Sequence, residues 1–183
     1  LTVLVQEILP HLKHVPVFVA GGLGRGAALL ASLEMGAAGA QLGTRFAASA
    51  ESIAHENFKR AFIRANARDA LPSIQLDERF PVIPVRGLVN EGTRRFLAHQ
   101  AATLARFQSG ELTKEAAQLD IEHFWAGALR RAVIDGDVEN GSVMAGQSVG
   151  MVTAVQSVAE IIAELVAQAT AALALRPQPA TTA

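Results

Sequence analysis

The sequence predicts an α/β fold with parallel strands, and two segments that end in glycine carry this prediction. PVFVAGGLGRG (16–26) and GAQLGTRF (39–46) each begin with a short apolar run, reach glycine and then enter a helical pattern. Continuous apolar runs of this length are typical of strands buried on both faces of a parallel sheet. The resulting order of helix, strand, helix, strand and helix predicts parallel strands joined by right-handed crossovers.

Both strands end in residues that leave the backbone N–H groups accessible. Gly21 and Gly22 follow the first strand, and Gly43 and Thr44 follow the second. Backbone N–H groups gathered at one place form a phosphate cradle, which in (β/α)8 barrels commonly lies after strands 7 and 8. The alternative is a pair of ordinary turns in which glycine serves only to allow a positive φ. Two such turns at consecutive βα units favour the cradle, and thus the last part of a barrel.

Two further details concern the kind of phosphate site that these segments could form. The glycine spacing at 21, 22, 24 and 26 does not match the dinucleotide fingerprint G-x-G-x-x-G, and no acidic residue ends the next strand. Arg45 either neutralises the phosphate or forms a structural ion pair with Glu51 or Glu56.

The remaining patterns predict the other elements in order. An amphipathic helix up to about residue 13 is interrupted by Pro10, and Gly36 is expected to end the second helix. Ser49 or Ser52 is expected to cap the third. The expected ranges are a strand at 16–20, helices at 25–35 and 50–66, a strand at 38–42, edge strands or extended connections at 69–86, helices at 91–107, 114–133 and 156–174, and a disordered tail at 176–183.

The glycine-rich segment GSVMAGQSVG (141–150) lies within a predicted long loop at 135–150, and long loops in small domains are usually functional. Such a loop can close over a flat cofactor, with Gln147 as a hydrogen-bond partner. The alternative is a mobile surface loop. The apolar residues favour a packed lid over the mobile loop; they are Val143, Met144, Val149 and Met151.

The composition excludes several classes of protein. The chain has 183 residues, a net charge of −1 and no cysteine, so disulfides and thiolate chemistry are absent. There is no basic patch for nucleic acid and no apolar run long enough for a membrane span, so we expect a cytoplasmic protein. The five histidines form no metal-binding or nucleophile pattern. A complete barrel needs about 250 residues, and the chain does not begin with Met, so we expect it to start part-way through a longer product.

These segments together resemble the nitronate monooxygenase family and the related flavin-dependent enoyl-acyl-carrier-protein reductases of the second type. The similarity covers most of the chain. The carrying segments are VPVFVAGGLGRG (15–26), GAAGAQLGTRFAASAES (36–52), AHENFK (54–59), PVRGLVN (84–90) and LRRAVIDGDVENGSVMAGQSVG (129–150).

The resemblance implies an FMN-binding (β/α)8 TIM barrel with a smaller inserted α/β domain. The last βα units of the barrel would occupy residues 1–66, the small domain and a flavin-facing loop 67–149, and a helix returning to the barrel 150–175. It implies no catalytic residue in this chain, because the family's catalytic histidine would precede residue 1. With Gly21 from the cradle, the predicted cofactor-binding residues are Gly21, Gly22, Gln41, Leu42, Gly43, Thr44, Met144, Ala145, Gly146 and Gln147.

The function expected from the resemblance is the oxidative denitrification of alkyl nitronates with FMN and O2. One alternative is an enoyl-thioester reductase that uses NAD(P)H to reduce FMN. A third is a flavin-binding fragment without catalysis. A small-molecule substrate is expected in the first two cases. The unpaired sheet edge of an incomplete barrel also favours self-association, so a homodimer is an expected assembly.

Overall fold

Two short parallel strands lie at the centre of the N-terminal part of the molecule. In the computed structural model, which describes residues 1–12 and 14–176, β1 (Phe18–Ala20) pairs in parallel with β2 (Gly39–Gln41), and Val19 lies opposite Ala40. Helix α2 (Gly26–Glu34) connects them. The predicted α/β class and the parallel pairing are therefore confirmed.

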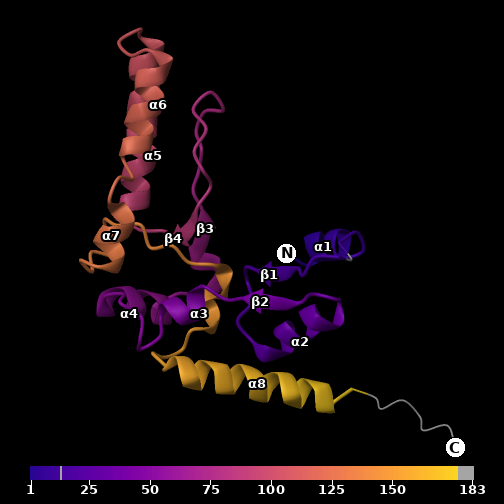
Figure 1. Ribbon diagram of the computed structural model, residues 1–183. Coiled ribbons are helices and arrows are strands. Elements are labelled where there is room, and N and C mark those ends of the chain that lie inside the picture. Colours follow the sequence, from indigo (N-terminus) through magenta and orange to yellow (C-terminus); the bar gives the residue numbers. More distant parts are fainter. Residues whose placement is uncertain (13, 177–183) are drawn as a thin grey trace, which may run out of the picture.

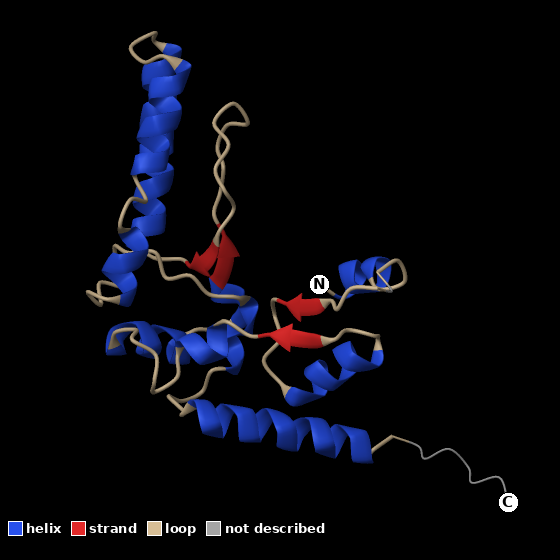
Figure 2. Ribbon diagram, viewed as in Figure 1, coloured by secondary structure: helices blue, strands red, loops and turns tan. Residues whose placement is uncertain are grey.

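Figures 1 and 2 show how the other elements surround this pair. Helix α1 lies beside β1, helix α8 crosses beneath α2, and helices α5 and α6 form an arm that extends away from the strands together with the β3–β4 hairpin. Their bounds are α1 Thr2–Ile8, α3 Thr44–Ala47, α4 Glu56–Arg64, η1 Ala67–Asp69, β3 Ala70–Pro72, β4 Arg86–Leu88, α5 Glu91–Gln108, α6 Lys114–His123, α7 Ala128–Val133, η2 Gln147–Met151 and α8 Val158–Ala174.

Helix α8 packs closely against α2, which lies more than a hundred residues earlier in the chain (Figure 1). Gly26 makes this approach feasible, because an added Cβ would lie 1.8 Å from the Leu165 carbonyl oxygen. The Gly26 N–H also donates to Gln168 Oε1 at 2.8 Å. Gly26, the last glycine of the first segment, thus serves helix packing.

We expect Gly26→Ala to lower the free energy of unfolding by about 2 kcal/mol, because the methyl group forces two backbones apart. Urea denaturation measures the change. The control is Ala27→Ser at the neighbouring exposed position, which should stay within about 0.5 kcal/mol of the unmodified chain. Equal stabilities for the two variants would contradict the close approach of α2 and α8.

The expectation that the strands are buried on both faces is wrong: β1 is buried on one face only, and no residue of β2 is fully buried. Val19 is 3% exposed, whereas Phe18 is 63% exposed. Alternate residues of a strand point to opposite faces. The face of Val19 is covered by a cluster that includes Val5 and Leu9 of the N-terminal segment, whereas the Phe18 ring lies beside Gly39 of β2 and stays largely exposed.

Several predicted helices have different bounds, for local reasons. The region predicted as one helix at 50–66 contains turns and then α4, capped by His55, whose Nδ1 accepts from the Asn57 N–H at 3.1 Å. Ser52 instead accepts from the Ala54 N–H within a turn, and Ser49 caps no helix. The helix predicted at 114–133 is divided into α6 and α7 by Gly127, which has a φ of 73°.

The two ends of the chain differ partly from the prediction. The first helix ends at Ile8, before Pro10, and residue 13 lies outside the described residues. Gly36 follows α2 with a φ of 103°, as expected of a helix end. Of the predicted tail, Arg176 forms an ion pair with Glu34 at 2.6 Å, and residues 177–183 lie outside the described part.

The region after residue 66 builds a separate apolar cluster in the arm. Strands β3 and β4 pair antiparallel, which agrees with the expected extended segments at 69–86. Helices α5 and α6 enclose Phe80, Phe96 and Ile121 in their own core. No helix in the described part of the chain has both the length and the apolar character needed to cross a bilayer.

Candidate functional site

The glycines at the carboxyl ends of β1 and β2 leave open space beside the backbone. Gly21 and Gly22 have φ values of 100° and 71°, and Gly43 lies at the adjacent strand end. A Cβ built on any of the three would meet no atom within 4 Å. Since the two strands run in parallel, their ends form one surface with two bare stretches of backbone, at Gly21–Gly22 and at Gly43.

Gly43 differs from the first two glycines in its conformation. Its φ of −89° and ψ of −59° are accessible to every residue type, so the backbone does not require glycine there. Packing within the described residues does not require it either, because the space beside it is empty. An ordinary turn that needs a positive φ therefore explains the glycines at 21 and 22. It does not explain why residue 43 is glycine.

Arg45 is buried directly behind this surface. Its side chain is 4% exposed and donates to three groups: the Gly24 carbonyl oxygen at 3.0 Å, Gln156 Oε1 at 2.8 Å and Glu164 Oε2 at 2.7 Å. Arg45 therefore pairs with Glu164 and not with Glu51 or Glu56, and its guanidinium is engaged inside the fold instead of facing a phosphate.

 Glu51, which is not a partner of Arg45, accepts from the Val158 N–H at the start of α8, at 2.9 Å.

The Arg45 contacts tie the first glycine loop to α8. Hydrogen bonds from Arg45, and then from Gln156, lower the pKa of Glu164 from its ordinary value of 4.5 to about 2. A fixed negative charge therefore faces the guanidinium at neutral pH. Because Gly24 O accepts from the same guanidinium, this ion pair positions the loop that follows β1.

The loop at 143–147 lies against the second strand end. Val143 and Ala145 are buried, whereas Met144 between them is 39% exposed, which is the alternation of an extended strand. Met144 forms a β-bridge with Gly87, and the Ala145 N–H donates to the Arg86 carbonyl oxygen at 3.1 Å. The loop thus extends the β3–β4 sheet.

A hydrogen bond joins this loop to the glycine surface. The Gly146 N–H donates to Thr44 Oγ1 at 3.1 Å, across a separation of 102 residues. The prediction of a packed segment is confirmed for Val143 and Val149, which are buried, but it is wrong for Met144, whose side chain lies on the opposite side of the strand.

The ten residues predicted to bind the cofactor are therefore placed in two connected groups. The strand-end group comprises Gly21, Gly22, Gln41, Leu42, Gly43 and Thr44, and the loop group comprises Met144, Ala145, Gly146 and Gln147. The bond between Thr44 and Gly146 joins the groups. Gln41 and Gln147 are exposed beside them, whereas the Ala145 methyl group packs in the core, so only the backbone of Ala145 is accessible for a ligand.

Asn90 is a residue of this region that sequence reasoning missed. It is 9% exposed and caps α5 by accepting from the Thr93 N–H at 2.9 Å. Its amide also donates to the carbonyl oxygens of Val138 and Gly141, at 2.7 and 2.8 Å. An asparagine before a helical pattern predicts a helix cap. Its hydrogen bonds to Val138 and Gly141, about fifty residues later in the chain, cannot be predicted from the neighbouring sequence.

We expect Asn90→Ala to lower the free energy of unfolding by about 2 kcal/mol, because it removes a helix cap and leaves two carbonyl oxygens without their donor. Thr113→Ala is the matched control, since Thr113 caps α6 through a single bond to the Ala116 N–H. Urea denaturation should show a smaller loss for the control. Equal losses would mean that the contacts to Val138 and Gly141 contribute nothing.

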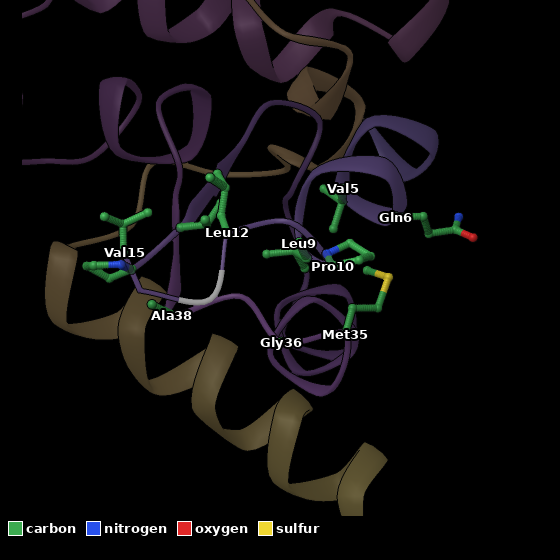
Figure 3. Close-up of a pocket in the computed structure, with 11 residues that line it drawn as sticks. Val5, Gln6, Leu9, Pro10, Leu12, Val15, Met35, Gly36 and Ala38 are labelled. Atoms are coloured by element: carbon green, nitrogen blue, oxygen red, sulfur yellow. The ribbon is translucent and has the colours of Figure 1, made fainter.

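A cavity of about 520 Å³ lies at the opposite ends of the strands. Figure 3 shows Val5, Leu9 and Met35 toward one end of it and Val15 and Ala38 toward the other. These residues precede β1 and β2 or belong to α1, so the cavity lies at the amino ends of the strands. Ligand sites of βα proteins lie at the carboxyl ends, so we assign no function to this cavity.

A second cavity, of about 810 Å³, lies between the β3–β4 hairpin and helices α5 to α7, with Met144 in its lining. No cluster of three or more His, Asp or Glu side chains suited to a metal ion occurs among residues 1–12 and 14–176.

The fold defines an α/β protein whose distinctive features lie at the carboxyl ends of its parallel strands. The family model described as nitronate monooxygenase matches residues 1–168. The chain belongs to the nitronate monooxygenase family, a family of flavin-dependent oxidoreductases.

Individual relatives agree with this membership. The chain is 26% identical to a (3aS,4S,5R,7aS)-5-hydroxy-7a-methyl-1-oxo-octahydro-1H-indene-4-carboxyl-CoA dehydrogenase of Rhodococcus jostii, over 92% of this chain and 53% of the relative. It is 28% identical to a probable nitronate monooxygenase of Bacillus subtilis, over 82% of this chain and 39% of the relative. The chain thus spans about half the length of these relatives or less.

Solved structures resemble the chain over nearly its whole length. FabK from Thermotoga maritima has a TM-score of 0.76 and 30% identity, covering 94% of this chain and 49% of that chain. Nitroalkane oxidase from Streptomyces ansochromogenes has a TM-score of 0.66 and 26% identity, covering 94% of this chain and 44% of that one.

Proposed function

We propose that this chain binds the phosphate of FMN at the carboxyl ends of β1 and β2, as the final βα units of a (β/α)8 barrel. The observation that carries the proposal is the bare backbone at Gly43, where neither conformation nor packing calls for glycine. A phosphate group needs close approach to backbone N–H groups, and a side chain at this position would prevent it.

The residues present fit such a group. Gly21, Gly22 and Gly43 would receive the phosphate, and Thr44 would present its hydroxyl beside it. Thr44 Oγ1 already accepts from the Gly146 N–H, which leaves its hydroxyl proton free to be donated to a phosphate oxygen. Arg45 would act indirectly, since its guanidinium holds the Gly24 carbonyl oxygen and thus the glycine loop.

The proposed reaction is the oxidation of alkyl nitronates with O2 as electron acceptor. When bound, FMN supplies the two-electron chemistry, and this chain supplies the anchoring and orientation of the flavin. Gln147 and Met144 would lie at its border. The catalytic base is proposed to come from sequence outside this chain, as is the rest of the barrel.

A second candidate is the oxidoreduction of an acyl thioester, with NAD(P)H as the reductant in the case of an enoyl substrate. Two observations favour it: the apolar cavity of about 810 Å³ beside Met144, and the similarity to the carboxyl-CoA dehydrogenase of Rhodococcus jostii. Nitronates of small alkanes have no need for a cavity of this size.

The test is a titration of the purified chain with FMN and, in parallel, with riboflavin, which lacks the phosphate. We expect FMN to bind with one-to-one stoichiometry and at least about tenfold more tightly, because charge-assisted hydrogen bonds to the phosphate contribute about 1.5–3 kcal/mol each. Equal affinities would refute the phosphate site. Oxygen uptake with propionate 3-nitronate, compared with NAD(P)H oxidation with an enoyl thioester, separates the two reactions when it is measured on an FMN-loaded protein that also contains the sequence proposed to supply the catalytic base.

A further inference from the structure

The three methionines of the chain differ in how accessible their side chains are. Met144 and Met35 are each 39% exposed. Met151 is partly buried, and its Sδ lies 2.7 Å from the position of a Cβ added to Gly24. Oxidation of a methionine thioether to the sulfoxide requires that the oxidant reach the sulfur. Met144 and Met35 are therefore the methionines most open to this reaction.

The backbone around Met144 is fixed, so its side chain is the part that is free to change. Met144 forms a β-bridge with Gly87, and the Leu88 N–H donates to the Val143 carbonyl oxygen at 2.9 Å. The neighbours Val143 and Ala145 are buried. None of these contacts involves the thioether sulfur. Oxidation of the sulfur would therefore leave the strand pairing intact and give a folded product with an altered surface.

Met144 differs from Met35 in what lies beside it. Two residues after Met144, the Gly146 N–H donates to Thr44 at the carboxyl ends of the strands, where the flavin is proposed to lie. Met35 follows α2 and lines the cavity at the amino ends of the strands. Reduced flavins pass electrons to O2, and hydrogen peroxide is the two-electron product. Peroxide formed at the flavin would reach Met144 before it reaches Met35.

We propose that Met144 is a site of reversible oxidation by hydrogen peroxide, through which peroxide made at the flavin alters the neighbouring cavity. The O–O bond of the peroxide breaks, one oxygen atom bonds to the sulfur, and the other leaves as water with both protons. The sulfur loses two electrons and the peroxide gains them. The sulfoxide is polar, so one wall of the cavity of about 810 Å³ becomes polar. The source of the peroxide rests on the proposed function, whereas the reactivity of Met144 does not.

Hydrogen peroxide added to the purified chain tests the reactivity without FMN. Peptide mass spectrometry should show Met144 and Met35 gaining one oxygen atom at rates within about threefold of each other, and at least about twofold faster than Met151. Methionine sulfoxide reductases should then restore the thioether of Met144, while the far-ultraviolet circular dichroism stays unchanged throughout. A Met144 that remains unmodified, or that cannot be reduced again, would overturn the proposal.

Nile red, a neutral dye that fluoresces in apolar surroundings, tests the effect on the cavity. Oxidation of the chain should weaken dye binding at least about threefold, because a polar group replaces an apolar contact. Met144→Leu should keep its dye affinity after peroxide treatment, since leucine is apolar and is not oxidised. Met35→Leu is the matched control, because Met35 is equally exposed, and it should lose affinity as the unmodified chain does. An affinity that does not respond to oxidation, or that falls equally in Met144→Leu, would refute the effect.

Peroxide generated by bound FMN separates this inference from the proposed function. The FMN-loaded chain is reduced by light in the presence of EDTA and then exposed to air. The ratio of oxidised Met144 to oxidised Met35 should be at least about threefold higher than with added peroxide. An unchanged ratio in a chain that prefers FMN to riboflavin would refute oxidation by the flavin's own peroxide and leave the phosphate site standing. Reversible oxidation of Met144 in a chain that does not bind FMN would support its reactivity and refute the proposed function.

Discussion

Replacing Gly43 by valine is expected to weaken FMN binding about hundredfold while leaving riboflavin binding nearly unchanged. The valine side chain would occupy the space that a phosphate needs and would prevent about two charge-assisted hydrogen bonds. The fold should persist, because the φ and ψ of Gly43 suit any residue and no atom lies within 4 Å of an added Cβ. Flavin absorbance titration measures the affinities, and circular dichroism verifies the helix content.

Ala38→Val is the matched control for this variant. Ala38 is exposed just before β2, at the other end of the strand from Gly43, so the same β-branched side chain is introduced far from the proposed phosphate. It should leave FMN affinity unchanged. If Gly43→Val also retains the preference for FMN over riboflavin, the phosphate does not bind at this strand end.

The strand ends could be predicted from sequence because their signals are local. An apolar run followed by glycine specifies a buried strand and the turn after it, and the parallel order follows from the alternation with helices. These segments also contain the strand-end group of candidate residues, whereas the loop group comes from the glycine-rich segment at 141–150. Their junction, the bond from Gly146 to Thr44, joins residues 102 positions apart and has no local signal.

Two predictions, the single helix at 50–66 and the burial of Met144, were wrong for reasons that lie outside the local sequence pattern. The single helix predicted at 50–66 was wrong because serine and histidine can both accept from a backbone N–H, and only the surrounding contacts decide which one caps the helix. The exposed side of Met144 was missed because its apolar character was read as burial. In an extended segment, however, an apolar residue between two buried neighbours points to the other face.

Arg45 illustrates a limit of reading charges from their neighbours in sequence. Glu51 and Glu56 are the first acidic residues that follow it in the chain, but its partner is Glu164, which α8 brings to it from 119 residues away. The partner is set by the close packing of α8 on α2, which depends on Gly26. A glycine in the first segment thus determines the electrostatic environment of an arginine in the second.

Removing Glu164 is therefore expected to destabilise the fold strongly. Glu164→Ala should lower the free energy of unfolding by about 3 kcal/mol, because it leaves the buried Arg45 guanidinium without its counter-ion. This loss lies at the lower end of what breaking a buried ion pair usually costs, because Glu164 itself is 37% exposed. Glu34→Ala is the matched control: it breaks the exposed pair with Arg176 and should cost less than about 1 kcal/mol.

The contribution of the Arg45–Glu164 ion pair to the free energy of unfolding should also depend on pH. The pKa of Glu164 is lowered from 4.5 to about 2 in the folded chain, so its contribution to stability is fully present above about pH 4.5 and is lost as the pH falls toward 2. The difference in the free energy of unfolding between the unmodified chain and Glu164→Ala should therefore shrink over that window, as urea denaturation at several pH values can measure. A difference that stays constant from pH 6 to about pH 2 would mean that the charge of Glu164 does not stabilise Arg45.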